Sequence, residues 1–196
     1  MSELAPYYFT IYWMVVLLLT LYKFVELYNC PHYMVIYKRD DYKPFLFFSF
    51  FYILLYGLRP VSGYYFGDTS NYAASYEMLQ TYGTFNAAGL IDVGADWLFN
   101  TVMQLCAQIM NVSVFFVIVI SFYIMLMYAG CRKLDLWHGA TLMLFCIGSF
   151  SFYTYSVNGI RNGVACSIVI LALAGVCKGE RVCPVLDSLS LWRPVF

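Results

Sequence analysis

The sequence predicts an all-α protein: a polytopic transmembrane helical bundle with about five spans and one amphipathic interfacial helix. Of its 196 residues, 62% are hydrophobic and 20% aromatic, whereas only 11% are charged, against about 25% in a typical soluble domain. The apolar residues form runs close to the ~20 residues that a helix needs to cross a bilayer. We therefore expect one transmembrane bundle over residues 1–176, with a long external loop at 59–96, and a cytoplasmic tail over 177–196.

Five apolar segments are expected to cross the membrane. The first stays in place, because the start of the chain lacks the basic region of a cleavable signal peptide and the apolar run is too long for one. The second is short and depends on flanking residues to reach the interface. The expected spans are residues 7–28, 45–58, 112–129, 139–157 and 159–176.

Residues 97–111 have a different pattern, in which polar and apolar side chains recur on opposite sides of a helix. This periodicity predicts an amphipathic helix that lies at the interface or lines the bundle. The polar stripe is Asn100, Gln104, Gln108 and Asn111, and the apolar stripe is Leu98, Val102, Leu105 and Ile109.

The basic residues predict the orientation, because cytoplasmic loops carry an excess of Lys and Arg. Clusters follow the first, third and fifth expected spans, and they fall on one side if residues 97–111 do not cross. The amino terminus, the 59–96 loop and the turn at Asn158 then face outward, which in a bacterial inner membrane is the periplasm. The clustered residues are Lys38, Arg39, Lys43, Arg132, Lys133, Lys178 and Arg181.

Several function classes have no support in the sequence. The net charge is zero and there is no basic run, so nucleic-acid binding is not indicated. The seven cysteines show no metal-ligand spacing, and we expect them to be packing residues, with no metal site and no cofactor. His32 and His138 are expected to be solvated loop residues, and nucleotide-binding or serine-hydrolase motifs are absent.

Arg161 is the most distinctive polar residue, because it falls in the first turn of an expected span, between Asn158 and Asn162. The amino end of a helix carries partial positive charge, and a guanidinium group is suited to phosphate oxygens. An anion site is one interpretation, and an arginine that reaches out to lipid headgroups is the other. The same two interpretations hold for Arg59, which ends the second span on the same side.

Asp68 lies in one of the least hydrophobic stretches of the chain, G-D-T-S-N-Y at residues 67–72. A partly desolvated carboxylate can act as a general base, yet this stretch is equally rich in helix-capping residues. Tyr72, Tyr76 and Leu79 follow at helical spacing, which predicts a short external helix with an aromatic face.

Two segments together resemble the EpsG family, Wzy-like membrane proteins of exopolysaccharide and O-antigen synthesis. They are Y-G-L-R-P-V-S-G-Y-Y-F-G-D-T-S-N-Y-A-A-S-Y (56–76) and S-F-Y-T-Y-S-V-N-G-I-R-N-G-V-A-C-S-I (151–168). The family pattern is an arginine that ends a span, a G-x-D-x-x-x-Y-like stretch, and a later span that opens with an N-G-I-R-Q-like turn. Asn162 stands where glutamine is usual. The matching residues are Arg59, Gly67, Asp68, Thr69, Asn71, Tyr72, Tyr76, Asn158, Gly159, Arg161 and Asn162.

The resemblance implies a glycosyl transfer that moves a growing glycan from its polyprenyl diphosphate carrier onto the next lipid-linked repeat unit. Asp68, Arg59 and Arg161 would be catalytic, and Gly67, Thr69, Asn71, Tyr72, Tyr76, Asn158 and Asn162 would contact substrate. The partners would be the lipid-linked oligosaccharide, the bilayer and other polysaccharide assembly proteins. Three alternatives stay open: addition of a single sugar, a non-enzymatic transporter or assembly subunit, and an inactive remnant, since family members usually continue for several more spans.

Overall fold

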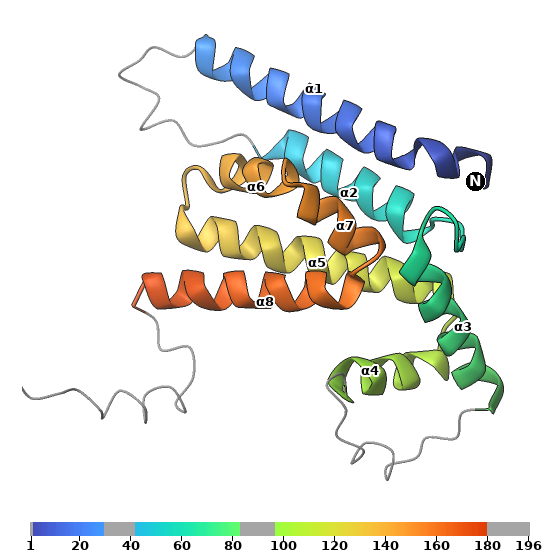
Figure 1. The fold of residues 1–196 in the computed structure, drawn as a ribbon. Helices are drawn as coiled ribbons and strands as arrows, with labels where there is room; N and C mark the ends of the chain where they lie inside the picture. Colours follow the sequence, from blue (N-terminus) through green and yellow to red (C-terminus); the bar gives the residue numbers. More distant parts are fainter. Residues whose placement is uncertain (1, 30–41, 83–96, 180–196) are drawn as a thin grey trace, which may run out of the picture.

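The computed structural model describes residues 2–29, 42–82 and 97–179, and within these ranges the protein is a bundle of helices. Figure 1 shows α5 lying between α2 and α8, with α1 on the side of the bundle away from α8. Helix α6 packs against α1 and α5, and α7 packs against α8. The expected all-α bundle is confirmed. The helices are η1 (Ser2–Tyr7), α1 (Tyr8–Tyr28), α2 (Lys43–Gly57), α3 (Gly67–Tyr82), α4 (Trp97–Ala107), α5 (Val112–Leu134), α6 (Gly139–Ile147), α7 (Phe150–Val157) and α8 (Ile160–Cys177).

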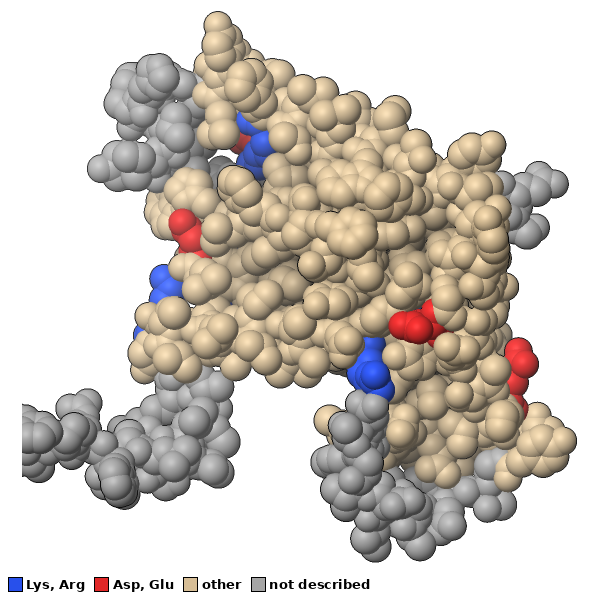
Figure 2. Space-filling model, in the orientation of Figure 1, with Lys and Arg blue, Asp and Glu red and all other residues tan. Residues whose placement is uncertain are grey.

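Three helices of the described residues are long and apolar enough to cross a membrane: Ala5–Tyr28, Val112–Leu134 and Ile160–Cys177. The α6–α7 pair would be a fourth span if its two helices count together. Helix α2 has 15 residues, or about 22 Å at 1.5 Å per residue, so it is shorter than a typical span. Figure 2 shows that charged side chains lie toward the ends of the visible face, whose middle is uncharged.

The fourth expected span is not continuous, which corrects the expectation of one helix over 139–157. The chain bends by 74° between α6 and α7, and Ser149 caps the new helix by accepting a hydrogen bond from the Phe152 amide at 3.3 Å. Helix breaks inside a bundle are tolerated where side chains satisfy the freed backbone groups. Here the hydroxyl of Tyr12 donates to the carbonyl of Ile147.

The amphipathic helix is also shorter than expected, since α4 ends at Ala107. Asn111, assigned to its polar stripe, instead caps α5, because its side chain accepts a hydrogen bond from the Val114 amide at 2.9 Å. The face of α4 that packs inward contains Phe99 and Met103. The predicted apolar stripe is largely exposed. Helix α4 is therefore apolar both on the side that packs inward and on this exposed side.

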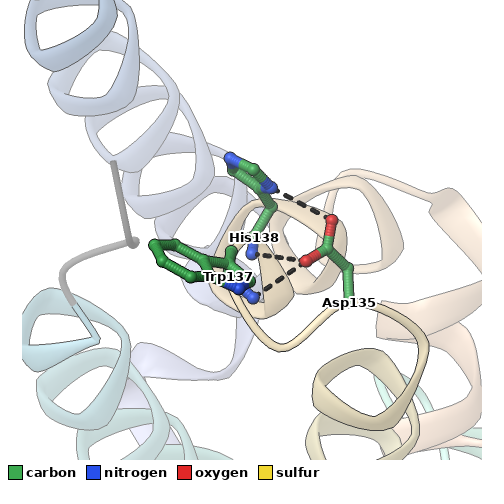
Figure 3. A network of polar contacts seen from close by, with 3 residues as sticks. All are labelled: Asp135, Trp137 and His138. Carbon is green, nitrogen blue, oxygen red and sulfur yellow. Dashed lines mark hydrogen bonds and ion pairs between the residues drawn. The ribbon is translucent and has the colours of Figure 1, made fainter. Parts of the chain in front are cut away.

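The turn between α5 and α6 is held by Asp135, whose carboxylate accepts hydrogen bonds from the backbone amides of Trp137 and His138 at 2.8 and 3.1 Å (Figure 3). Its other oxygen lies 3.0 Å from Nδ1 of His138. The side-chain hydrogen bond with His138 lowers the pKa of Asp135 below its ordinary value. The Asp135–His138 pair therefore fixes a turn at the end of the bundle that carries Arg132 and Lys133.

Candidate functional site

The two motif segments meet at one end of the bundle. The end of α2, the start of α3 and the end of α7 lie together there (Figure 1). The hydroxyl of Thr69 donates a hydrogen bond to the carbonyl of Val157 at 2.8 Å, although the two residues are 88 positions apart. Arg59 donates to the same carbonyl at 2.9 Å. Tertiary contact therefore joins stretches that the sequence could only place on the same side.

Arg59 is at the centre of this junction, and its guanidinium group is buried, with 3% of the residue exposed. Its Nε and Nη2 donate to the hydroxyl oxygen of Thr69 at 3.1 and 2.9 Å, and its Nη1 donates to the carbonyl of Tyr56 at 2.7 Å. The ring of Phe116 lies 4.9 Å away, a distance at which a cation is attracted to a ring face. We call Arg59, Thr69 and the carbonyls of Tyr56 and Val157 the Arg59 clamp.

Both carbonyls of the clamp belong to helix ends, since Tyr56 is next to last in α2 and Val157 is the last residue of α7. The carboxyl end of a helix carries partial negative charge, which stabilises a cation by about 0.3–1 kcal/mol at exposed sites and by more when buried. Burial lowers the pKa of Arg59 to about 10, so the group stays cationic at neutral pH. The clamp therefore holds a buried charge with neutral partners.

Helix α3 divides the predicted residues of the G-D-T-S-N-Y stretch between its surface and its packed side. Gly67, Asp68 and Asn71 are exposed, whereas Thr69 is fully buried. Asp68 lies in the first turn of the helix, where a negative charge is favourable. We conclude that Asp68 is open to solvent, next to a residue that belongs to the buried clamp.

The two tyrosines of α3 pack against neighbouring helices, which agrees with the expected aromatic face. Tyr76 is fully buried and donates a hydrogen bond to the carbonyl of Met110 at 2.9 Å. Tyr72 is half-buried, with its ring centroid 5.7 Å from that of Phe99 in α4. Tyr76 therefore fixes α3 to the chain just before α5, whereas part of the Tyr72 side chain remains exposed to solvent.

Arg161 lies on the wall of a cavity in the described part of the chain. The cavity has a volume of about 460 Å³ and is formed by α4 and the amino-terminal halves of α5 and α8; we call it the apolar groove. Apart from Arg161, its walls are almost entirely hydrophobic. They consist of Leu98, Phe99, Val102, Cys106, Phe115, Ile118, Val119, Phe122, Arg161, Val164, Ala165 and Ile168.

The turn before Arg161 is tightly built. Asn158 is the cap that follows α7 and Gly159 precedes α8, and the backbone amides of both donate to the carbonyl of Thr154 at 2.8 and 3.0 Å. A Cβ at Gly163 would lie 3.0 Å from the carbonyl oxygen of Tyr155, closer than ordinary contacts, so the second glycine of N-G-I-R-N-G allows α8 to approach α7. The side chain of Asn162 is exposed.

The predicted catalytic residues therefore fall into three places. Arg59 belongs to the clamp with Thr69, Asp68 lies on the surface of α3 with Gly67 and Asn71, and Arg161 lines the apolar groove. The other four predicted site residues are Tyr72 and Tyr76, which pack against neighbouring helices, and Asn158 and Asn162, which flank Arg161. The groove itself was not expected from the sequence. The sequence signal for it was the predicted apolar stripe of residues 97–111, since Leu98 and Val102 of that stripe line the groove.

A comparison with protein families identifies a match for this chain. The family model described as "EpsG family" matches residues 42–183, which include both motif segments and every wall of the groove. The chain belongs to the EpsG family. Membership in the EpsG family indicates a membrane protein of polysaccharide biosynthesis, and the apolar helices agree with a multi-pass membrane protein. Searches of curated proteins and of solved structures found no match.

Proposed function

We propose that this EpsG-family protein is a Wzy-like glycosyltransferase that polymerises polyprenyl-diphosphate-linked repeat units at the outer face of a bacterial inner membrane. The observation that carries the proposal is an arginine on the wall of an otherwise apolar groove, at the end of the bundle where the two family motifs meet. A lipid-linked diphosphate needs both features: a hydrophobic surface for its chain and a cation for its phosphates.

The groove suits the carrier in size and composition. Its volume of about 460 Å³ falls in the ~300–1,000 Å³ range of pockets that hold small molecules. It would take the part of the polyprenyl chain next to the diphosphate, with the rest among lipids. The exposed apolar side chains of α4 and α8, among them Leu98 and Ile168, would contact the same chain.

Arg161 would bind the diphosphate and stabilise the charge that develops on it. During transfer, a hydroxyl oxygen of the acceptor sugar forms a bond to the anomeric carbon of the donor. The bond from that carbon to the diphosphate oxygen breaks, and its electron pair leaves with the diphosphate. Asp68 would take the acceptor's proton as general base, and the first turn of α8 adds backbone dipoles to the guanidinium.

The remaining predicted residues would shape the sugar-facing surface. Asn71 and the solvent-exposed part of Tyr72 would contact sugars, while Asn158 and Asn162 flank Arg161. Gly67, Thr69 and Tyr76 would support this surface, because Thr69 and Tyr76 are buried and hydrogen-bonded within the protein. Contacts with other polysaccharide assembly proteins are part of the proposal.

The test is complementation of a strain in which this gene is deleted, with Arg161→Ala compared with Arg132→Ala. Arg132 lies at the opposite end of the bundle, in the last turn of α5, and it serves as a matched control. Polymer ladders are expected from the wild type and the control, with single lipid-linked repeats accumulating in Arg161→Ala. Normal chain lengths in Arg161→Ala would refute the assignment.

A second measurement separates transfer from transport. Purified protein is incubated with a polyprenyl-diphosphate-linked oligosaccharide extracted from the deletion strain, and the products are separated by size. Longer lipid-linked chains support polymerisation, and addition of one unit only would favour a transferase of a single unit. Unchanged substrate, together with restored polymer in cells, would favour a transporter or assembly subunit.

A further inference from the structure

Arg59 is buried and bonded inside the protein, whereas an arginine that binds substrate must face a cavity or solvent. Four hydrogen bonds join its guanidinium to oxygen atoms of the protein: two to Thr69, one to Tyr56 and one to Val157. A guanidinium has five N–H donors, so nearly all of its capacity is used inside the protein. Arg59 is also not among the residues that line the apolar groove.

The clamp lies next to both proposed catalytic helix starts, those of α3 and α8. Val157 is the last residue of α7, and Arg161 follows four residues later in the first turn of α8. Thr69 is the neighbour of Asp68 in the first turn of α3. Two of the proposed catalytic side chains are therefore each within four residues of a clamp atom, although they lie on different helices.

The clamp joins α3 to both the end of α2 and the end of α7. The hydroxyl of Thr69 accepts two hydrogen bonds from Arg59 and donates its own to the carbonyl of Val157. The planar guanidinium donates to the ends of both α2 and α7, and its carbon lies 4.9 Å from the ring centroid of Phe116 in α5. A movement of α3 relative to α7 would break several charge-assisted hydrogen bonds at once.

From these contacts we propose that Arg59 is a positioning residue. Through Thr69 and Val157, it holds Asp68 at the start of α3 and Arg161 at the start of α8 at a fixed separation. This role rests on the proposed glycosyl transfer for its catalytic consequence. It replaces the direct contact with diphosphate that the sequence suggested for Arg59. Arg161 then provides the cation at the groove, and Arg59 provides the geometry.

The test uses a matched pair at Thr69. Thr69→Val keeps the shape of the side chain and removes the hydroxyl, whereas Thr69→Ser keeps the hydroxyl. In Thr69→Val we expect kcat to fall about 10- to 100-fold, as for a small misplacement of reacting groups, with KM within about twofold because the groove walls are unchanged. Thr69→Ser should stay within about twofold of the wild type in both constants.

Hydrogen exchange provides a readout that needs no substrate. In Thr69→Val, exchange at the hydrogen-bonded amides of Asn158, Gly159 and Gly163 is expected to rise by up to about tenfold. Exchange in the middle of α5 should not change. If the wild type forms no polymer, the proposed function fails, while this exchange pattern alone decides whether the clamp holds the turn.

A second variant keeps the inference testable if Thr69→Val does not fold. Arg59→Lys keeps the positive charge but loses the planar fork, so it should lose activity about as fully as Arg59→Ala. Retention of more than about a third of the wild-type rate in Arg59→Lys, with none in Arg59→Ala, would indicate a simple charge contact with phosphate and overturn the positioning role. Unchanged exchange in Thr69→Val would overturn it as well.

Discussion

Replacement of Gly57 by alanine tests how closely α2 and α5 approach each other. A Cβ at position 57 would lie 2.7 Å from Cγ2 of Val117 and 2.9 Å from its Cα. The second contact is with backbone, so no side-chain rotation removes it. The helices would have to separate by about 0.5 Å to reach the shortest ordinary contact of 3.4 Å.

The expected cost combines two terms of opposite sign. Overpacking of this kind destabilises a protein by about 1–3 kcal/mol, and alanine regains at most about 1 kcal/mol over glycine in a helix. Gly57 is the last residue of α2, where the gain is smaller, so we expect a net loss of about 1–2 kcal/mol. The shift should also disturb the Arg59 clamp, because the Tyr56 carbonyl and Arg59 lie on either side of position 57 in the chain.

The assay is reversible unfolding of the purified protein by SDS in mixed micelles. Gly67→Ala is the control, because a Cβ there meets nothing within 4 Å. Combining Gly57→Ala with Val117→Ala should recover only part of the loss, since the contact with the backbone atom remains. Equal stability of Gly57→Ala and Gly67→Ala would refute the packing argument.

Three further changes have defined outcomes in the same unfolding assay. Gly163→Ala should cost about 1–3 kcal/mol, because its Cβ would lie 3.0 Å from a backbone oxygen of α7; a neutral effect would contradict the close approach. Tyr76→Phe should cost about 0.5–1.5 kcal/mol through the lost hydrogen bond to Met110, and no loss would mean that this bond does not hold α3. Asp135→Ala should cost less than about 1 kcal/mol at pH 7, as surface pairs do. The hydrogen bond with His138 lowers the pKa of Asp135. The contribution of Asp135 to the free energy of unfolding is therefore present above the ordinary carboxyl pKa of about 4 and is lost as the pH falls through the lower folded pKa. A stability difference from wild type that grows as the pH falls through this range would contradict the argument.

The arrangement of the loops was largely predictable from local patterns. The apolar runs predicted the helices of the bundle, because a span must satisfy its backbone within itself. Helices α3, α5 and α8 begin at one end of the bundle, and α1 and α5 end at the other (Figure 1). This is the alternation that the positions of the basic residues indicated.

The composition and the helical spacing of the apolar residues determined, from the sequence alone, that the chain is a helical bundle with its family motifs at one end. Both are local properties of the chain. Only the tertiary structure decided which polar residues meet. It buried Arg59 against Thr69 and Val157, because the ends of α2 and α7 converge there, and it left Arg161 on the wall of the groove. Those outcomes depend on how α4, α5 and α8 pack together, and no single helix carries that information in its own pattern.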